Sequence, residues 1–182
     1  MSPKKTNRVI IIKGSPGVGK SYISMKLASK LKNRKLAVIP IDFILHLDQG
    51  LLNENKLKLA KTNTALLVNS FLRRKYDVII DYSFDKISHL EFLLKEIAQE
   101  PKIYKPIPQI TVIHLTAPLK EVRKRNINRI DGSDPLPENI LVKLYNRCEN
   151  TVNLIPGEIV LDIFKYSTKQ IVNKILKEID ED

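Results

Sequence analysis

The sequence predicts a three-layer α/β domain, in which a parallel β-sheet lies between two layers of helices. Short apolar runs rich in β-branched residues alternate along the chain with longer stretches of helical periodicity. The runs are apolar at nearly every position, which is typical of strands that are buried on both faces of a parallel sheet. The five expected strands are residues 8–13, 36–41, 77–80, 109–115 and 158–161.

Stretches with the 3.6-residue spacing of amphipathic helices lie between and after these strands. Two of them begin with the Ser-x-x-Glu/Gln spacing of a capping box, Ser88 with Glu91 and Ser167 with Gln170. We therefore expect both serines to cap helices. The apolar faces consist of Ile23, Leu27 and Leu31; of Leu90, Leu93, Leu94 and Ile97; and of Ile171, Ile175 and Ile179.

Length and composition indicate one globular domain over residues 1–182. Hydrophobic residues make up 43% of the chain and charged residues 28%, which excludes disordered and collagen-like classes. The longest apolar runs are too short to span a membrane, so no membrane association is expected. Cys148 is the single cysteine and cannot form an internal disulfide, which favours a reducing, cytoplasmic compartment.

The chain is basic, with 31 Lys and Arg against 20 Asp and Glu, or a net charge of +11. Such a surface attracts anions such as nucleotides and nucleic acids, although scattered lysines also occur on ordinary solvated surfaces.

Two segments have irregular compositions. Residues 100–108 contain three prolines and are expected to form a surface loop, and residues 131–137 form a turn-rich break between two helices that could act as a mobile lid.

A complete G-x-x-x-x-G-K-[ST] pattern follows the first predicted strand and opens the first helix. Glycines allow backbone N–H groups to approach phosphate oxygens, and the helix N-terminus adds partial positive charge. Lys20 would contact the β- and γ-phosphates, and the Ser21 hydroxyl would bind Mg²⁺. The expected nucleotide-binding residues are Gly14, Ser15, Pro16, Gly17, Val18, Gly19, Lys20, Ser21 and Tyr22.

Two aspartates directly follow apolar strands. Asp81 ends the third strand, where a buried carboxylate can orient Mg²⁺ or its water shell, although a turn or cap residue would also fit there. Asp42 follows the second strand and is the best candidate for a base that takes a proton from an acceptor hydroxyl; an N-cap role is the alternative. His46 and Asp48 are weaker candidates for that base. Phe43, Ile44 and Leu47 could line an apolar acceptor pocket or a helical core.

A basic helix is expected over residues 118–130. Arg125 and Arg129 are four residues apart, so their guanidinium groups share one face, whereas Arg123 points elsewhere. Planar guanidinium groups suit the dispersed charge of a phosphoryl group in transfer, and a solvated basic face is the alternative. Arg147 on the next helix is a further candidate phosphate contact.

Together, the glycine-rich loop, Asp42, Asp81 and the lid sequence Arg125-Asn126-Ile127-Asn128-Arg129 resemble the small P-loop kinases. The lid is similar to those of polynucleotide kinase and O-phosphoseryl-tRNA kinase, and the size and the Asp42 region to chloramphenicol phosphotransferase. The resemblance implies a sheet of order 2-3-1-4-5, a lid over about 118–147, ATP and Mg²⁺ as cosubstrates, Asp42 as base, and Arg125 and Arg129 near the nucleotide and its phosphates. The arginine that the nucleic-acid kinases carry after the base is replaced here by Phe43, so a small-molecule acceptor is at least as well supported.

The expected function is therefore transfer of the γ-phosphoryl group of ATP to a hydroxyl on a small molecule or a nucleic-acid 5′ end, by a monomer or homodimer. One alternative is a nucleoside monophosphate kinase, for which Arg73, Arg74 and Lys75 could bind the acceptor phosphate unless they merely end a helix. Another is a nucleotide-dependent switch or RNA-binding protein without transferase activity. The positive charge favours the latter, whereas the aromatic content of 6% gives few platforms for base stacking.

Overall fold

A five-stranded parallel sheet with the order β2-β3-β1-β4-β5 forms the centre of the protein. The computed structural model describes residues 6–31, 34–47, 50–99, 107–128 and 134–180. Both the parallel sheet and its predicted strand order are thus confirmed. The strands are β1 (Arg8–Gly14), β2 (Leu36–Pro40), β3 (Asp77–Asp81), β4 (Gln109–Thr116) and β5 (Ile159–Asp162).

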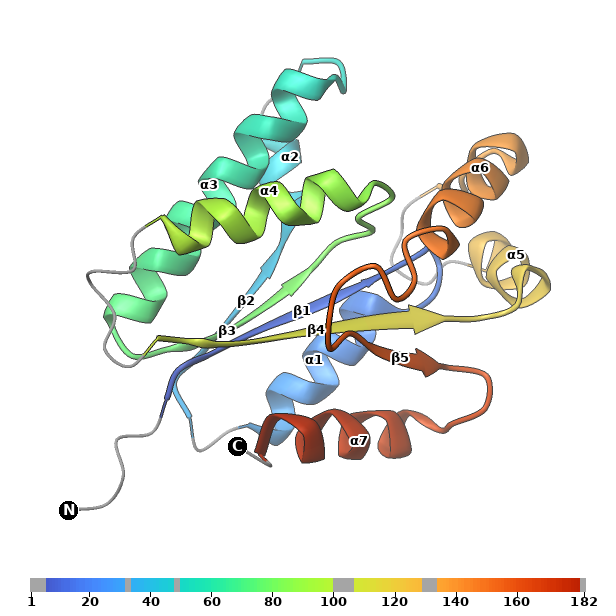
Figure 1. Cartoon of the computed structure of the whole chain (residues 1–182). Helices are drawn as coiled ribbons and strands as arrows, with labels where there is room; N and C mark the ends of the chain where they lie inside the picture. Colours follow the sequence, from blue (N-terminus) through green and yellow to red (C-terminus); the bar gives the residue numbers. More distant parts are fainter. Residues whose placement is uncertain (1–5, 32–33, 48–49, 100–106, 129–133, 181–182) are drawn as a thin grey trace.

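Helices cover both faces of the sheet and its carboxyl edge (Figure 1). Helices α3 and α4 lie on one face, and α1 and α7 lie on the other. Helices α5 and α6 extend beyond the carboxyl ends of the central strands, and α2 follows β2 directly. The helices are α1 (Lys20–Lys30), α2 (Ile41–His46), α3 (Glu54–Arg73), α4 (Ile87–Ala98), α5 (Leu119–Ile127), α6 (Glu138–Glu149) and α7 (Thr168–Asp180).

The central strand β1 is buried at all seven positions and contributes to two separate cores. Successive side chains of a strand point to opposite faces of the sheet. Val9 and Ile11 therefore pack with α3 and α4, whereas Ile10 and Ile12 pack with α1 and α7. Burying each of these side chains contributes about 1.5–3 kcal/mol, so the uninterrupted apolar run of β1 holds the three layers together.

Strand pairing brings the chemistry-bearing residues to one edge. In the β1–β3 ladder Ile12 pairs with Asp81, and in the β1–β4 ladder Gly14 pairs with Leu115. Pro40 at the end of β2 also pairs with Asp81, so Asp42 follows just beyond the same edge. In an open parallel sheet, ligands bind at the carboxyl ends of the strands.

Several element boundaries differ from the sequence prediction. Strand β2 ends at Pro40, because Ile41 already begins α2, and β5 begins at Ile159 rather than at residue 158. The basic helix begins after Pro118 and ends at Ile127, with Asn128 as its C-cap. Of the expected loop over 100–108 only residues 107–108 are described, and of the lid segment 131–137 only residues 134–137.

One of the two predicted capping boxes is confirmed. The Ser167 N–H and hydroxyl both donate to the Gln170 side chain at 2.9 Å, and the Gln170 N–H donates back to the serine hydroxyl at 3.4 Å. The other box was wrong, because α4 begins at Ile87 and its N-cap is Lys86, which leaves Ser88 inside the first turn. The helix thus begins one residue before the serine, three residues after the fully buried Phe84.

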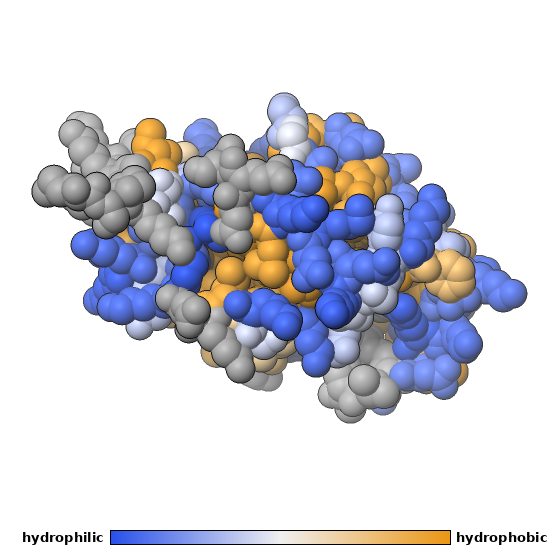
Figure 2. Space-filling view, turned by 90° about the horizontal axis from the view of Figure 1, so that it is seen from below, coloured by the Kyte–Doolittle hydropathy of each residue, from blue (hydrophilic) through white to orange (hydrophobic). Residues whose placement is uncertain are grey.

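The surface is predominantly hydrophilic on the face shown in Figure 2, where an apolar area lies among charged and polar residues. None of the helices within the described ranges is both long and apolar enough to cross a bilayer.

The two serines should differ in how much each contributes to the free energy of unfolding. Replacing Ser167→Ala removes the cap of α7 and is expected to lower the free energy of unfolding by about 1 kcal/mol. Ser88→Ala, the matched control, should change it by less than about 0.5 kcal/mol, because the side chain is exposed and caps nothing. Urea denaturation of both variants checks this; equal losses would contradict the assignment of the caps.

Candidate active site

The glycine-rich loop joins β1 to α1 as the sequence predicts. Gly14 has a φ of 141°, and a Cβ at this position would lie 2.3 Å from the Leu115 carbonyl oxygen. Gly19, the N-cap of α1, has a left-handed φ of 94°. Only glycine adopts both conformations without strain, and the loop therefore turns its backbone toward the start of α1. Val18 is buried beneath the loop, whereas Pro16 and Gly17 are half-buried on it.

Lys20 lies folded over this loop. Its ammonium group donates to the Ser15 carbonyl oxygen at 3.1 Å, and its side chain is largely buried. The Ser15 hydroxyl is sealed from solvent and has no hydrogen-bond partner within the described residues. Tyr22, in contrast, is 54% exposed and its ring faces the Lys26 ammonium at 5.3 Å. Lys20 is thus held where an anion above the loop would meet its charge.

Ser21 and Asp81 form the contact between the loop and β3. The Ser21 hydroxyl donates to Asp81 Oδ1 at 3.0 Å, while Asp81 Oδ2 is buried and has no hydrogen-bond partner among the described residues. Burial raises the pKa of Asp81; the Ser21 hydrogen bond and the Lys20 charge oppose that rise, and the negative charge of Asp42 adds to it. A hydroxyl beside an unsatisfied carboxylate oxygen is a donor set that Mg²⁺ prefers. These residues therefore fit a magnesium ion that also contacts phosphates.

Asp42 lies in the first turn of α2 with its side chain exposed. The alternative N-cap role does not apply, because the N-cap of α2 is Pro40. Its charge contributes to raising the pKa values of both Asp81 and Tyr82. Pro40, two residues before Asp42, pairs with Asp81 in the β2–β3 ladder. His46 is exposed at the other end of the same short helix, and Asp48 lies outside the described residues.

Helix α5 packs against the loop and directs Arg125 to it. The Arg125 guanidinium donates from Nη1 to the Val18 carbonyl at 3.3 Å. Asn126 fixes the far side of α5, because its side chain accepts from the Leu136 N–H at 3.0 Å and donates to the Leu136 carbonyl at 2.9 Å. Arg123 instead points away and pairs with Glu138 at 2.6 Å. Arg129 lies outside the described residues.

Helix α6 lies next to this group. Its Tyr145 hydroxyl donates to the Ala117 carbonyl at 3.1 Å, which anchors α6 to the end of β4. Arg147 on the same helix pairs with Asp85 in the β3–α4 connection, with 3.2 Å between the guanidinium nitrogen and the carboxylate oxygen. Arg147 therefore contacts a protein carboxylate, at the side of the site away from α5.

The basic residues 73–75 lie far from the loop. Arg73 ends α3, and Arg74 is its C-cap and donates to the Ser70 carbonyl. The chain enters β3 at Asp77, so these residues lie at the amino edge of the sheet, opposite Gly14 and Asp81. The three residues therefore end a helix and cannot bind an acceptor phosphate at the loop.

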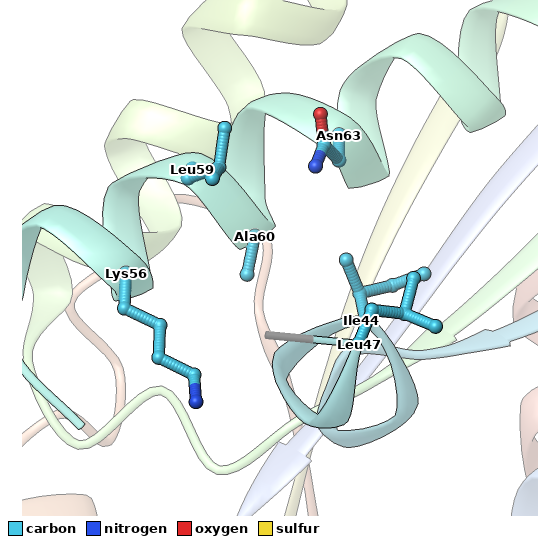
Figure 3. Close-up of a pocket in the computed structure, with 6 residues that line it drawn as sticks. All are labelled: Ile44, Leu47, Lys56, Leu59, Ala60 and Asn63. Carbon is cyan, nitrogen blue, oxygen red and sulfur yellow. The ribbon is translucent and has the colours of Figure 1, made fainter. Parts of the chain in front are cut away.

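A small cavity of about 220 Å³ lies between α2 and α3 (Figure 3). Ile44 and Leu47 line it, as expected for an apolar pocket, whereas Phe43 is 70% exposed and does not. The helix opposite supplies Lys56, Leu59, Ala60 and Asn63.

A buried ionic cluster beneath the loop was not anticipated from the sequence. Lys13 directly precedes Gly14, and its ammonium contacts Glu158 at 2.8 Å and the Thr151 carbonyl at 2.6 Å, with both charged side chains fully buried. His114 lies 3.3 Å from the same Glu158 oxygen. The one available signal was a lysine that ends an otherwise apolar strand. The cluster ties β1 to the chain that follows α6.

The buried Asp81 carboxylate gives a testable effect of pH and Mg²⁺. A carboxyl with a raised pKa binds more protons folded than unfolded, so the stability of the ligand-free protein falls as pH rises from the unfolded pKa through the folded one. Asp81→Asn should therefore be more stable than wild type at neutral pH without ligand. The factor by which Mg²⁺ increases nucleotide affinity should be about 10- to 100-fold smaller in this variant than in wild type.

Asp77→Asn is the matched control for this experiment. Asp77 is also buried on β3, but it lies at the other end of the strand and pairs with Arg34. Thermal denaturation and calorimetric nucleotide titrations with and without Mg²⁺ measure both effects. A normal Mg²⁺ response in Asp81→Asn, or its loss in Asp77→Asn, would contradict the proposed metal site.

Known structures share this architecture. Kti12 of Chaetomium thermophilum in complex with ADP-AlF3 is 19% identical over 93% of this chain and 97% of that chain, with a TM-score of 0.66. The APS kinase CysC of Mycobacterium tuberculosis, solved with AMPPNP and APS, is 14% identical over 97% and 99%, with a TM-score of 0.69. A gluconokinase from Sinorhizobium meliloti is 15% identical over 95% and 91%, with a TM-score of 0.68. The fold is therefore that of the small P-loop kinases, as predicted.

The family model described as "Chromatin associated protein KTI12" matches residues 8–179, from the first strand to the last helix. The match includes the glycine-rich loop, both aspartates and the arginine helix. The chain therefore belongs to the KTI12 family of proteins with a P-loop kinase fold.

Proposed function

We propose that this protein binds ATP with Mg²⁺ at residues 14–21 and transfers the γ-phosphoryl group to a hydroxyl acceptor. The observation that carries the proposal is the contact between Ser21 and the buried, half-satisfied carboxylate of Asp81. A second carboxylate, Asp42, is exposed at the same edge and close enough for its charge to act on Asp81. The groups that we propose to bind the metal and the acceptor are thereby adjacent.

The loop and Lys20 would hold the triphosphate. Backbone N–H groups of the loop and the N-terminus of α1 bind phosphate oxygens, and the Lys20 ammonium exchanges the Ser15 carbonyl for the β- and γ-phosphates. Ser21 and Asp81 would hold Mg²⁺, which neutralises phosphate charge when it is bound. Tyr22 would lie beside the phosphates at the first turn of α1. Because all these groups are positioned before ATP binds, little reorganisation is required.

Asp42 would orient the acceptor hydroxyl and accept its proton as the hydroxyl oxygen bonds to the γ-phosphorus and the bond to the β-phosphate oxygen breaks. Arg125 already contacts the loop through Val18, and it would turn its remaining donors to the transferring phosphoryl group. Arg129, four residues further along the sequence, would supply a second guanidinium.

The residue that follows Asp81 favours phosphoryl transfer to an acceptor over hydrolysis of ATP. Motor-type ATPases place a water-activating Glu there, whereas this chain has Tyr82. Burial raises the pKa of Tyr82, and the charges of Asp42 and Asp85 raise it further, so the phenol stays protonated and cannot act as a base. Asp42 is then the better-placed base.

A nucleotide-dependent nucleic-acid-binding function is the second candidate. The net charge of +11 and the family description, chromatin-associated, favour it. Binding through phosphate contacts would weaken steeply with salt. Salt-dependent RNA or DNA binding that responds to ATP, without transfer to any acceptor, would support this function instead.

A nucleoside monophosphate kinase would instead phosphorylate AMP, GMP, UMP or CMP, but residues 73–75 lie at the wrong edge of the sheet to bind their phosphates.

A transfer screen tests the main proposal. γ-Labelled ATP is offered with 5′-hydroxyl RNA and DNA, nucleosides, nucleoside monophosphates and hydroxylated metabolites. Label should appear on an acceptor with wild type. With Asp42→Asn the transfer rate should fall about 10²- to 10⁴-fold, because the base is lost, while ATP affinity is unchanged. Near-normal turnover by this variant would exclude Asp42 as the base.

The two arginines of α5 provide a matched pair. Arg125→Gln should lower the transfer rate about 10²-fold, because the guanidinium at the loop is lost. Arg123→Gln removes the same charge from the same helix but only an exposed pair with Glu138, so its rate should stay within about twofold of wild type. Single-turnover kinetics measure both. Equal losses would mean that α5 acts through its overall charge and not through Arg125.

A further inference from the structure

A buried cation lies on α3 beside the catalytic edge and is not used by the chemistry described above. Lys61 is only 4% exposed. Its ammonium makes no hydrogen bond or ion pair with any residue in the described part of the chain. Nor is that ammonium one of the buried nitrogens sealed from solvent. Lys61 is therefore a largely buried cation whose ammonium reaches solvent and has no direct partner among the described residues.

The carboxylates around Lys61 already have other cationic partners. Glu54 pairs with Lys86 at 2.5 Å, and Asp85 pairs with Arg147 at 3.2 Å. His89 also lies between the two carboxylates, 3.3 Å from Glu54, but burial lowers its pKa and the Lys61 charge lowers it further, so it is largely uncharged at neutral pH. Glu54 and Asp85 are thus each paired with another permanent cation, and neither contacts Lys61 directly.

This cluster adjoins the proposed reaction centre. Asp85 follows Asp81 by four residues, and its charge acts on Lys61, Tyr82 and Cys148. Cys148 is in turn within range of the Lys20 charge, and its thiol lies 3.7 Å from the Ser83 carbonyl. Electrostatic interactions thus connect Lys61 on α3 with Asp85 in the β3–α4 connection, and Cys148 on α6 with both Asp85 and Lys20.

We propose that Lys61 is an anion-binding residue of the acceptor site and that the acceptor carries a phosphate group in addition to the hydroxyl that is phosphorylated. This inference rests on the proposed function and specifies its substrate class. The acceptor phosphate supplies the missing counter-charge to Lys61. Arg147, which flanks Asp85 from the opposite element, provides a second cation suited to a phosphate dianion.

A structural role and an anion-binding role for Lys61 predict opposite effects of its removal on the stability of the fold. If its charge held α3 against Glu54 and Asp85, its removal would destabilise the fold. If it waits for a ligand, replacing it with an apolar side chain of similar length relieves an uncompensated charge. Lys61→Met should therefore unfold at the same temperature as the ligand-free wild type or higher.

Inorganic phosphate is the probe for the site, used with the full chain saturated with Mg²⁺ and AMPPNP so that the glycine-rich loop is occupied. Phosphate at tenfold above its Kd should raise the melting temperature of wild type by about 3–6 °C. The rise should vanish in Lys61→Met and persist in Lys58→Met, which removes the same charge from an exposed position on α3. An unchanged rise in Lys61→Met, or a ligand-free variant that melts several degrees lower, would overturn the assignment.

Transfer assays separate this proposal from the proposed function. With an acceptor found by the screen, Lys61→Met should raise the acceptor KM about 10- to 100-fold and leave the KM for ATP unchanged. An unchanged acceptor KM would refute the role of Lys61 while transfer itself stands. Phosphate binding that depends on Lys61 without transfer to any acceptor would refute the transferase and retain the anion site.

Discussion

The pairing of β1 with β3 is the constraint on which the candidate site depends. It aligns Ile12 with Asp81, and the glycine-rich loop leaves β1 two residues later. The Ser21 hydroxyl, in the first turn of α1, therefore donates to the buried Asp81 carboxylate at 3.0 Å. The apolar side chains that hold β1 between two cores fix this register, because a shift by one residue would exchange the two faces of the strand. Core packing and the Ser21–Asp81 contact, at which we propose that Mg²⁺ binds, are thus consequences of the same ladder.

Charge is distributed unequally around this edge. Beneath the loop, Lys13 is fully compensated by Glu158 and the Thr151 carbonyl, and the cluster joins β1 to the chain after α6. On the α3 side, Lys61 makes no such direct contact within the described residues, although the charges of Glu54 and Asp85 act on it. A fold selected for stability alone would replace an uncompensated buried ammonium with an apolar side chain. Uncompensated charge beside a reaction centre is typical of sites that are complete only when substrate is bound.

Sequence reasoning succeeded where a feature depends on neighbours along the chain. The glycine-rich loop, the alternating strands and the Ser167–Gln170 box all belong to this class. It failed where a distant contact decided the outcome. The box at Ser88 has correct spacing, yet α4 begins at Ile87 with Lys86 as its N-cap. Residues 73–75 carry suitable charge, but the direction of α3 carries them to the opposite edge of the sheet. Arg123 and Arg125 could be separated in advance, because helical spacing alone puts them on different faces.

The sequence by itself determined the layered α/β fold, the phosphate-binding loop and the two aspartates at strand ends, because each is encoded in a short window by residue type and spacing. Only the tertiary structure decided that Asp81 keeps one oxygen unsatisfied, that Arg125 contacts the loop while Arg147 contacts Asp85, and that Lys61 is buried. Burial and charge compensation are properties of the surroundings. Residues that are far apart in the chain create those surroundings, so a lysine in a lysine-rich sequence gives no sign of which side of the helix the protein covers.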